Sequence, residues 1–75
     1  MFPLSRLPLG RRARILSLSA ADPLKSRLMD LGFVPGGEIE PLYAAPWGDP
    51  RAYLICETVV ALRQRDAATV TVGDA

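Results

Sequence analysis

The chain is predicted to reverse direction at Ala45-Pro46-Trp47-Gly48-Asp49-Pro50, a proline-bracketed stretch that holds its single tryptophan. Residues 38–44 and 51–56 flank this stretch and have the composition of strands. Proline, glycine and aspartate are the residues that tight turns favour. The stretch therefore reads as the tip of a β-hairpin, and a β-rich fold is the first expectation.

The strand before this tip is expected to carry an irregularity. Its alternation places Ile39, Pro41 and Tyr43 on one face. Pro41 has no N–H to donate to a ladder, so it is predicted to lie at an unpaired edge or a bulge. Upstream, Val34-Pro35-Gly36-Gly37 fits a type II turn, with glycine where φ must be positive.

A short helix is predicted over residues 23–31. Asp22 can cap the free N–H groups, Pro23 suits the first helical position, and Gly32 is a typical stop. A helix of about two and a half turns must pack on a sheet to persist. Its apolar stripe, with i, i+4 and i+7 spacing, is Leu24, Leu28 and Leu31.

The remaining elements are short strands. Residues 11–19 form the first strand, and its apolar pattern changes phase after Ile15, which predicts a bulge. Tyr53 and Ile55 share one face of the strand over residues 51–56. A tight turn is expected at Glu57-Thr58, and a polar turn or a single helical turn is expected at residues 64–68. The last two strands are expected over residues 59–65 and 69–72. The fold class is therefore mainly β: a small barrel of about five strands with a short α-helix inserted after the first strand.

The composition limits the domain count and the kind of site. The chain has 75 residues, so residues 1–75 are expected to form a single domain. Histidine is absent and Cys56 is the single cysteine, so neither a metal site nor a catalytic base is evident, and no cofactor is expected. No apolar run approaches the ~18 residues of a membrane span, and no secretory signal is evident. A disulfide-free domain of this kind is expected in the cytoplasm.

The positions of the basic residues allow two interpretations. Eight of the nine positive residues are arginines, although the net charge is only +1. If they gather on one side of the barrel, they would bind an acidic protein segment, anionic lipid or nucleic acid. Otherwise they are solvated surface residues. The arginines in question are Arg11, Arg12, Arg14, Arg63 and Arg65.

Four pieces in order carry a resemblance to a known family: Leu9-Gly10, residues 27–36 (RLMDLGFVPG), residues 45–50 (APWGDP) and residues 60–63 (VALR). Together they resemble the FeoA family across nearly the whole chain. The resemblance implies an SH3-like barrel with a helical insertion after the first strand. Glu57 stands where the family commonly has glycine, which predicts a wider turn there.

The resemblance also implies a function. Family members accompany the bacterial membrane ferrous-iron transporter, a GTPase. They are thought to bind its cytoplasmic side and to support or regulate ferrous-iron uptake without being enzymes. The same barrel occurs in iron-dependent transcriptional repressors. The alternative is therefore a domain that is associated with such a regulator or that binds nucleic acid.

Five residues are the candidates for contact with a partner. Trp47 is either an exposed anchor or folded over the barrel mouth. The other four are Pro46 and Asp49 of the turn and Leu24 and Arg27 of the helix. Asp49 can also cap the backbone of its own turn. The partner surface is expected to combine Trp47 with the part of the helix that lies beside it.

Overall fold

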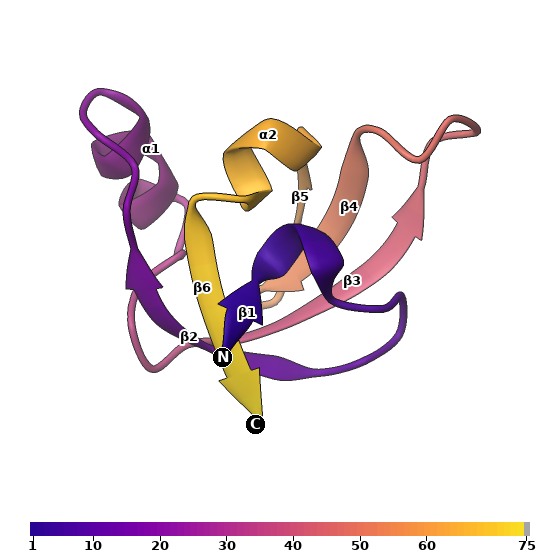
Figure 1. Cartoon of the computed structure of the whole chain (residues 1–75), viewed down its shortest axis with the longest axis horizontal. Helices are drawn as coiled ribbons and strands as arrows, with labels where there is room; N and C mark the ends of the chain where they lie inside the picture. The colour runs from indigo at the N-terminus through magenta and orange to yellow at the C-terminus, as the bar shows by residue number, and fades with distance from the viewer. Residues whose placement is uncertain (75) are drawn as a thin grey trace.

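Six antiparallel strands form one curved sheet in the computed structural model, which describes residues 1–74. Their order across the sheet is β1-β6-β2-β3-β4-β5. Figure 1 shows α1 at one end of the molecule and the loop between β3 and β4 at the other. The elements in chain order are β1 (Phe2–Pro3), the 3-10 turn η1 (Leu4–Arg6), β2 (Ala13–Leu18), α1 (Leu24–Asp30), β3 (Glu38–Ala44), β4 (Arg51–Ile55), β5 (Thr58–Leu62), α2 (Gln64–Ala67) and β6 (Val70–Asp74). The mainly-β prediction with a helix after the first long strand is confirmed.

The strand that the sequence did not predict is β1, at the N-terminus. It pairs with β6 through Phe2 opposite Val72 and Pro3 opposite Thr71. The 3-10 turn η1 follows directly and buries Leu4 in the core. A strand of two residues has no periodicity to recognise, so only its pairing with the distant β6 makes it a strand.

Two irregularities interrupt the ladders of the sheet. The pairing of β2 with β6 shifts register between Ile15 and Ser17, which confirms the bulge expected there. The pairing of β3 with β4 shifts between Pro41 and Tyr43, so Pro41 lies at a bulge as predicted. The shift corrects the placement of Tyr43, which is 60% exposed although Ile39 and Pro41 are buried. One extra residue in a strand turns every later side chain to the opposite face.

The helix α1 is one residue shorter at each end than predicted, because Pro23 is its N-cap residue rather than its first helical residue and Leu31 is its C-cap residue. The Oδ1 of Asp22 accepts hydrogen bonds from the Ser26 N–H, at 3.0 Å, and from the Ser26 hydroxyl, at 2.6 Å. Gly32 follows the helix with a φ of +107°, which favours glycine. Of the predicted stripe, Leu28 is fully buried, Leu24 partly buried and Leu31 exposed. The stripe therefore faces the core over only part of the helix.

The hairpin between β4 and β5 differs from its prediction. The turn residues are Cys56 and Glu57, both with positive φ, and Ile55 pairs directly with Thr58. This is a two-residue turn of the kind that matches the twist of the flanking strands. The predicted turn at Glu57-Thr58 is therefore wrong by one residue, and the predicted wider turn is absent. A φ of +61° at Glu57 explains why glycine suits this position.

The interior of the sheet is filled by apolar and aromatic side chains. Tyr53 and Ile55 of β4 lie on the same inner face, as predicted, and Leu28 reaches the same core from α1. The largest fully buried side chains also include Phe33, Leu4, Leu7, Ile15, Ile39, Val70 and Val72. None of the helices within residues 1–74 has the length and apolar character needed to cross a bilayer.

Candidate functional site

The tip loop, residues 45–50, projects from one end of the molecule (Figure 1). Two backbone hydrogen bonds close it: the Ala45 N–H donates to the Pro50 carbonyl at 2.9 Å, and the Gly48 N–H donates to the Ala45 carbonyl at 2.7 Å. Gly48 has a φ of +85°, a conformation that favours glycine. The loop holds Trp47 away from the core, with 91% of the residue exposed. Of the two arrangements considered for Trp47, the structure shows the exposed one.

A shallow groove of about 430 Å³ runs beside this loop over the outer face of β3, β4 and β5. Tyr43 and Val59 are its large exposed side chains. Neither residue is predictable as a site residue from alternation alone, which places Tyr43 on the inner face. The signal in the sequence is Pro41, because a bulge there turns Tyr43 outward. The residues of this outer groove are Tyr43, Ala44, Ala45, Pro50, Arg51, Ala52, Val59 and Ala61.

Asp49 anchors the tip loop to α2. Its Oδ1 accepts a hydrogen bond of 2.9 Å from the Gln64 backbone N–H, the first N–H of that helix. This contact corrects the expectation that Asp49 caps its own turn. The Gln64 side chain continues the connection, because its Nε2 donates to the Ser5 carbonyl at 3.2 Å. The loop, α2 and the N-terminal segment are therefore held together by one residue pair.

Arg51 lies beneath this connection and is 8% exposed. Its Nε donates to the Tyr53 hydroxyl at 3.1 Å, and its Nη2 donates to the Leu4 carbonyl at 3.2 Å. The guanidinium carbon also lies 5.2 Å from the centre of the Tyr53 ring, a cation–π distance. Burial raises the pKa of Tyr53, and the hydrogen bond from Arg51 opposes that rise. The Tyr53 hydroxyl in turn donates to Gln64 Oε1 at 3.4 Å.

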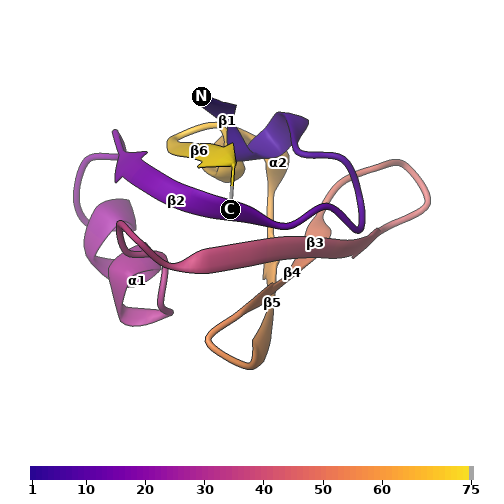
Figure 2. The ribbon, with the colours of Figure 1, turned by 90° about the horizontal axis from the view of Figure 1, so that it is seen from below.

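Leu24 and Arg27 lie at the opposite end of the molecule. Figures 1 and 2 both show α1 far from the tip loop. The structure therefore corrects the expectation that Trp47 and the helix form one surface. Leu24 and Arg27 belong instead to a pocket of about 540 Å³ between α1 and α2. Its lining is Ala21, Pro23, Leu24, Ser26, Arg27, Asp30, Arg65 and Asp66.

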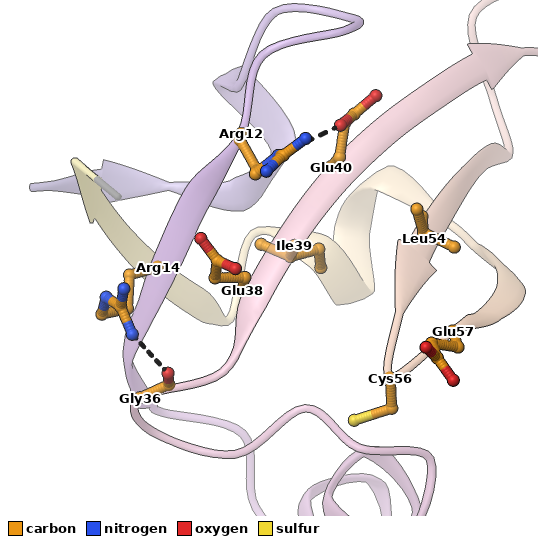
Figure 3. Close-up of a pocket in the computed structure, with 9 residues that line it drawn as sticks. All are labelled: Arg12, Arg14, Gly36, Glu38, Ile39, Glu40, Leu54, Cys56 and Glu57. Carbon is orange, nitrogen blue, oxygen red and sulfur yellow. Dashed lines mark hydrogen bonds and ion pairs between the residues drawn. The ribbon is translucent and has the colours of Figure 1, made fainter.

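A third pocket, of about 560 Å³, lies across β2, β3 and the β4–β5 turn (Figure 3). Within it, Arg12 Nε lies 3.5 Å from Glu40 Oε1, and Arg14 donates to the Gly36 carbonyl at 2.9 Å. Its lining is Arg12, Arg14, Gly36, Glu38, Ile39, Glu40, Leu54, Cys56 and Glu57. Arginine and glutamate are mixed here, whereas Arg65 lines the pocket beside α1. The arginines therefore do not form one continuous basic patch.

The third pocket also holds the cysteine. Figure 3 shows the side chains of Cys56 and Glu57 pointing away from each other. Among residues 1–74, no group of three histidine, cysteine, aspartate or glutamate side chains could hold a metal ion.

Comparison with known proteins shows the family. The sequence model of the FeoA domain matches residues 2–73. A Fe(2+) transport protein A/Fe(2+) transporter FeoB fusion protein of Porphyromonas gingivalis is 36% identical over 69 residues, which are 92% of this chain. The chain spans only 8% of the length of that fusion protein.

Solved structures agree with this result. The iron(II) transport protein A of Clostridium thermocellum is 42% identical with a TM-score of 0.90, over 95% of this chain and 44% of that one. The FeoA of Stenotrophomonas maltophilia complexed with zinc, described as an SH3 domain protein, is 35% identical with a TM-score of 0.86, over 97% and 91% of the two chains. A manganese-dependent transcriptional repressor, at 18% identity and a TM-score of 0.84, shares the fold alone. The chain belongs to the FeoA domain family, whose small SH3-like proteins take part in ferrous-iron transport.

Proposed function

We propose that this protein is a non-enzymatic accessory module that binds the cytoplasmic, GTPase-bearing part of a membrane ferrous-iron transporter. The observation that carries the proposal is the Porphyromonas gingivalis fusion protein, in which a segment 36% identical to this chain is covalently joined to FeoB. A fusion keeps two modules at high effective concentration, which is useful when the separate modules must meet.

The tip loop and the outer groove support this role as the docking surface. Trp47 is exposed in the tip loop, and Ala45 and Pro50 of the same loop line the outer groove together with the exposed Tyr43 and Val59. Tryptophan and tyrosine are enriched among the residues that dominate binding energy. The hydrogen bond between Asp49 and Gln64 holds the loop in place before any partner arrives. A preorganised loop loses less conformational entropy on binding.

Two groups have clearly perturbed pKa values, and both have structural partners within the fold. Hydrogen bonds from Ser26 lower the pKa of Asp22, which lies at the start of α1. Burial raises the pKa of Tyr53, which lies in the core beside Arg51. Catalytic groups typically owe such shifts to a cleft where substrate binds. Here the pKa shifts of Asp22 and Tyr53 come from hydrogen bonds and burial that form when the chain folds.

Binding to the purified transporter in lipid nanodiscs tests the proposal. The wild-type protein is titrated by biolayer interferometry without nucleotide, with GDP and with a non-hydrolysable GTP analogue. We expect Trp47→Ala to weaken binding by roughly tenfold or more, because it removes a central aromatic anchor. Met29→Ala is the matched control, since it removes an exposed apolar side chain from the far end, on α1.

Two results would count against the proposal in different ways. Absence of wild-type binding in every nucleotide state would exclude the transporter as the partner. Equal binding by wild type and Trp47→Ala, with a loss in Leu24→Ala or Arg27→Ala, would move the docking surface to α1. Far-UV circular dichroism of each variant confirms that the fold is retained, as expected for the exposed Trp47.

A further inference from the structure

The proposed docking role uses the outer face of β5, through Val59 and Ala61, but it does not use the backbone groups along the free edge of this strand. The strand pairs with β4 on one side, and the sheet ends there. The other edge strand, β1, has two residues, one of them proline. Figure 2 shows the hairpin of β4 and β5 projecting from the rest of the molecule.

Natural proteins usually protect such an edge, and β5 carries none of the usual devices. Lysine, proline, bulges and inward-pointing charges block the addition of a further strand. The sequence of β5 is Thr-Val-Val-Ala-Leu, which is uncharged and rich in β-branched residues. The register of β5 with β4 is continuous from Thr58 to Leu62, so no bulge twists the edge away.

The turn decides which backbone groups face outward. In a two-residue hairpin the closing pair, Ile55 and Thr58, exchanges both backbone hydrogen bonds. Alternation then directs the N–H and C=O groups of Thr58, Val60 and Leu62 toward β4. Those of Val59 and Ala61 point to the free edge, and no hydrogen bond of either group is found within the described chain.

We propose that the free edge of β5 pairs antiparallel with β5 of a second copy of this chain, centred on Val60. In this register Val59 of one copy and Ala61 of the other exchange backbone hydrogen bonds, which the outward groups allow. Thr58 lies opposite Leu62, and the two sheets become continuous. The interface is isologous, as a twofold dimer requires.

Charge complementarity selects this register and the second copy as the occupant. Glu57, directly before β5, lies opposite Arg63, directly after β5, of the other copy, and the pair occurs twice by symmetry. Both residues are exposed and lie just outside the strand: Glu57 is the second turn residue before β5, and Arg63 lies between β5 and α2. A shift of two residues along the edge keeps the backbone bonds but loses both charge pairs. Opposite charges in cross-strand positions are stabilising.

The small contact sets the expected affinity. A pairing of about five residues on each side falls well below the size of a stable interface, so the dimer is a weak one. We expect a dissociation constant between roughly 0.1 and 1 mM. The experiment uses the isolated protein without the transporter, so its outcome is independent of the docking proposal.

Sedimentation velocity and amide spectra from dilute solution to about 2 mM test the pairing. We expect the weight-average mass to rise with concentration and the amide signals of Val59 and Ala61 to move most. Glu57→Arg and Arg63→Glu should each raise the dissociation constant by roughly tenfold, because each places like charges opposite one another twice.

A mixture of the two variants separates edge pairing from any other association. In the mixed dimer, centred on Val60, both cross-strand positions again carry opposite charges, so the mixture should associate like wild type. Arg65→Glu, with the same change in net charge as Arg63→Glu but a position in α2, should behave like wild type. A monomer up to about 2 mM, or a mixture that associates no better than either variant alone, would overturn the proposal.

Discussion

Removing the buried guanidinium of Arg51 should destabilise the protein strongly. Arg51→Met keeps the aliphatic stem but loses the hydrogen bonds to the Tyr53 hydroxyl, at 3.1 Å, and to the Leu4 carbonyl, at 3.2 Å. Hydrogen bonds to charged groups contribute about 1.5–3 kcal/mol each, and the lost burial cost of the charge offsets part of this sum. We therefore expect the free energy of unfolding to fall by about 2–3 kcal/mol.

This loss is large for a domain of this size. At 0.05–0.15 kcal/mol per residue, 75 residues give a total of about 4–11 kcal/mol. Urea denaturation followed by far-UV circular dichroism measures the change, because the exposed Trp47 is a poor reporter of unfolding. The midpoint should fall while the m-value stays constant, and the melting temperature should drop by roughly 10–20 °C.

Two comparisons make the reasoning refutable. Arg51→Lys retains the charge but cannot reach both acceptors with one planar group, so its stability should fall between those of wild type and Arg51→Met. Arg11→Met removes an exposed arginine and should change the stability by less than about 0.5 kcal/mol. A stability of Arg51→Met equal to that of Arg11→Met would refute a role of the buried guanidinium in joining β4 to the N-terminal segment.

Three further predictions concern single contacts. Asp49→Ala should lower the free energy of unfolding, measured by urea denaturation, by about 1 kcal/mol and speed amide exchange at Gln64, because α2 loses the acceptor at its N-terminus. Asp49→Asn should lower it less, and equal stability of wild type and both variants would contradict this reasoning. Gly36→Val should lower the stability by about 1–3 kcal/mol through strain at a φ of +91°, since no atom lies within 4 Å of the added Cβ; a thermal midpoint equal to wild type would show that the turn relaxes freely. Burial raises the pKa of Tyr53, so part of the stability should be lost as the pH rises past 10.0, where the unfolded chain ionises first. Tyr53→Phe lacks this component, and its stability difference from wild type should narrow with rising pH; a constant difference would argue against the raised pKa.

The elements that the sequence predicts well are those marked by local backbone rules. The type II turn at Gly36 is confirmed by its φ of +91° and by the bond of 3.0 Å from the Gly37 N–H to the Val34 carbonyl. The helix stop at Gly32 and the bulge at Pro41 are confirmed in the same way. Each of these depends on one residue whose backbone allows few alternatives.

The errors lie where a distant pairing decides the outcome. The strand predicted over residues 59–65 is β5, which ends at Leu62. It ends there because α2 begins at Gln64, whose N–H donates to Asp49. The last strand continues to Asp74, not residue 72, because Gly73 and Asp74 pair with β2. Alternation within a segment carries no information about either contact.

The five candidate contact residues show the same division. The exposure of Trp47 follows from its place in a proline-bracketed turn, and the sequence marks that turn by itself. Only the tertiary structure separates Trp47, Pro46 and Asp49 from Leu24 and Arg27, because the curvature of the sheet sends the tip loop and α1 to opposite ends. Their contact with a partner stays a prediction.

The sequence by itself determined the class of fold, the helix, the turns and the family, because these depend on backbone preferences and on motifs a few residues long. The tertiary structure decided what the tip loop is attached to and what lies beside it. The bond between Asp49 and Gln64 joins positions 15 residues apart, and the contact of Arg51 with Leu4 joins positions 47 apart. Contacts of this range form only when the whole sheet has folded, so no local pattern could have predicted them.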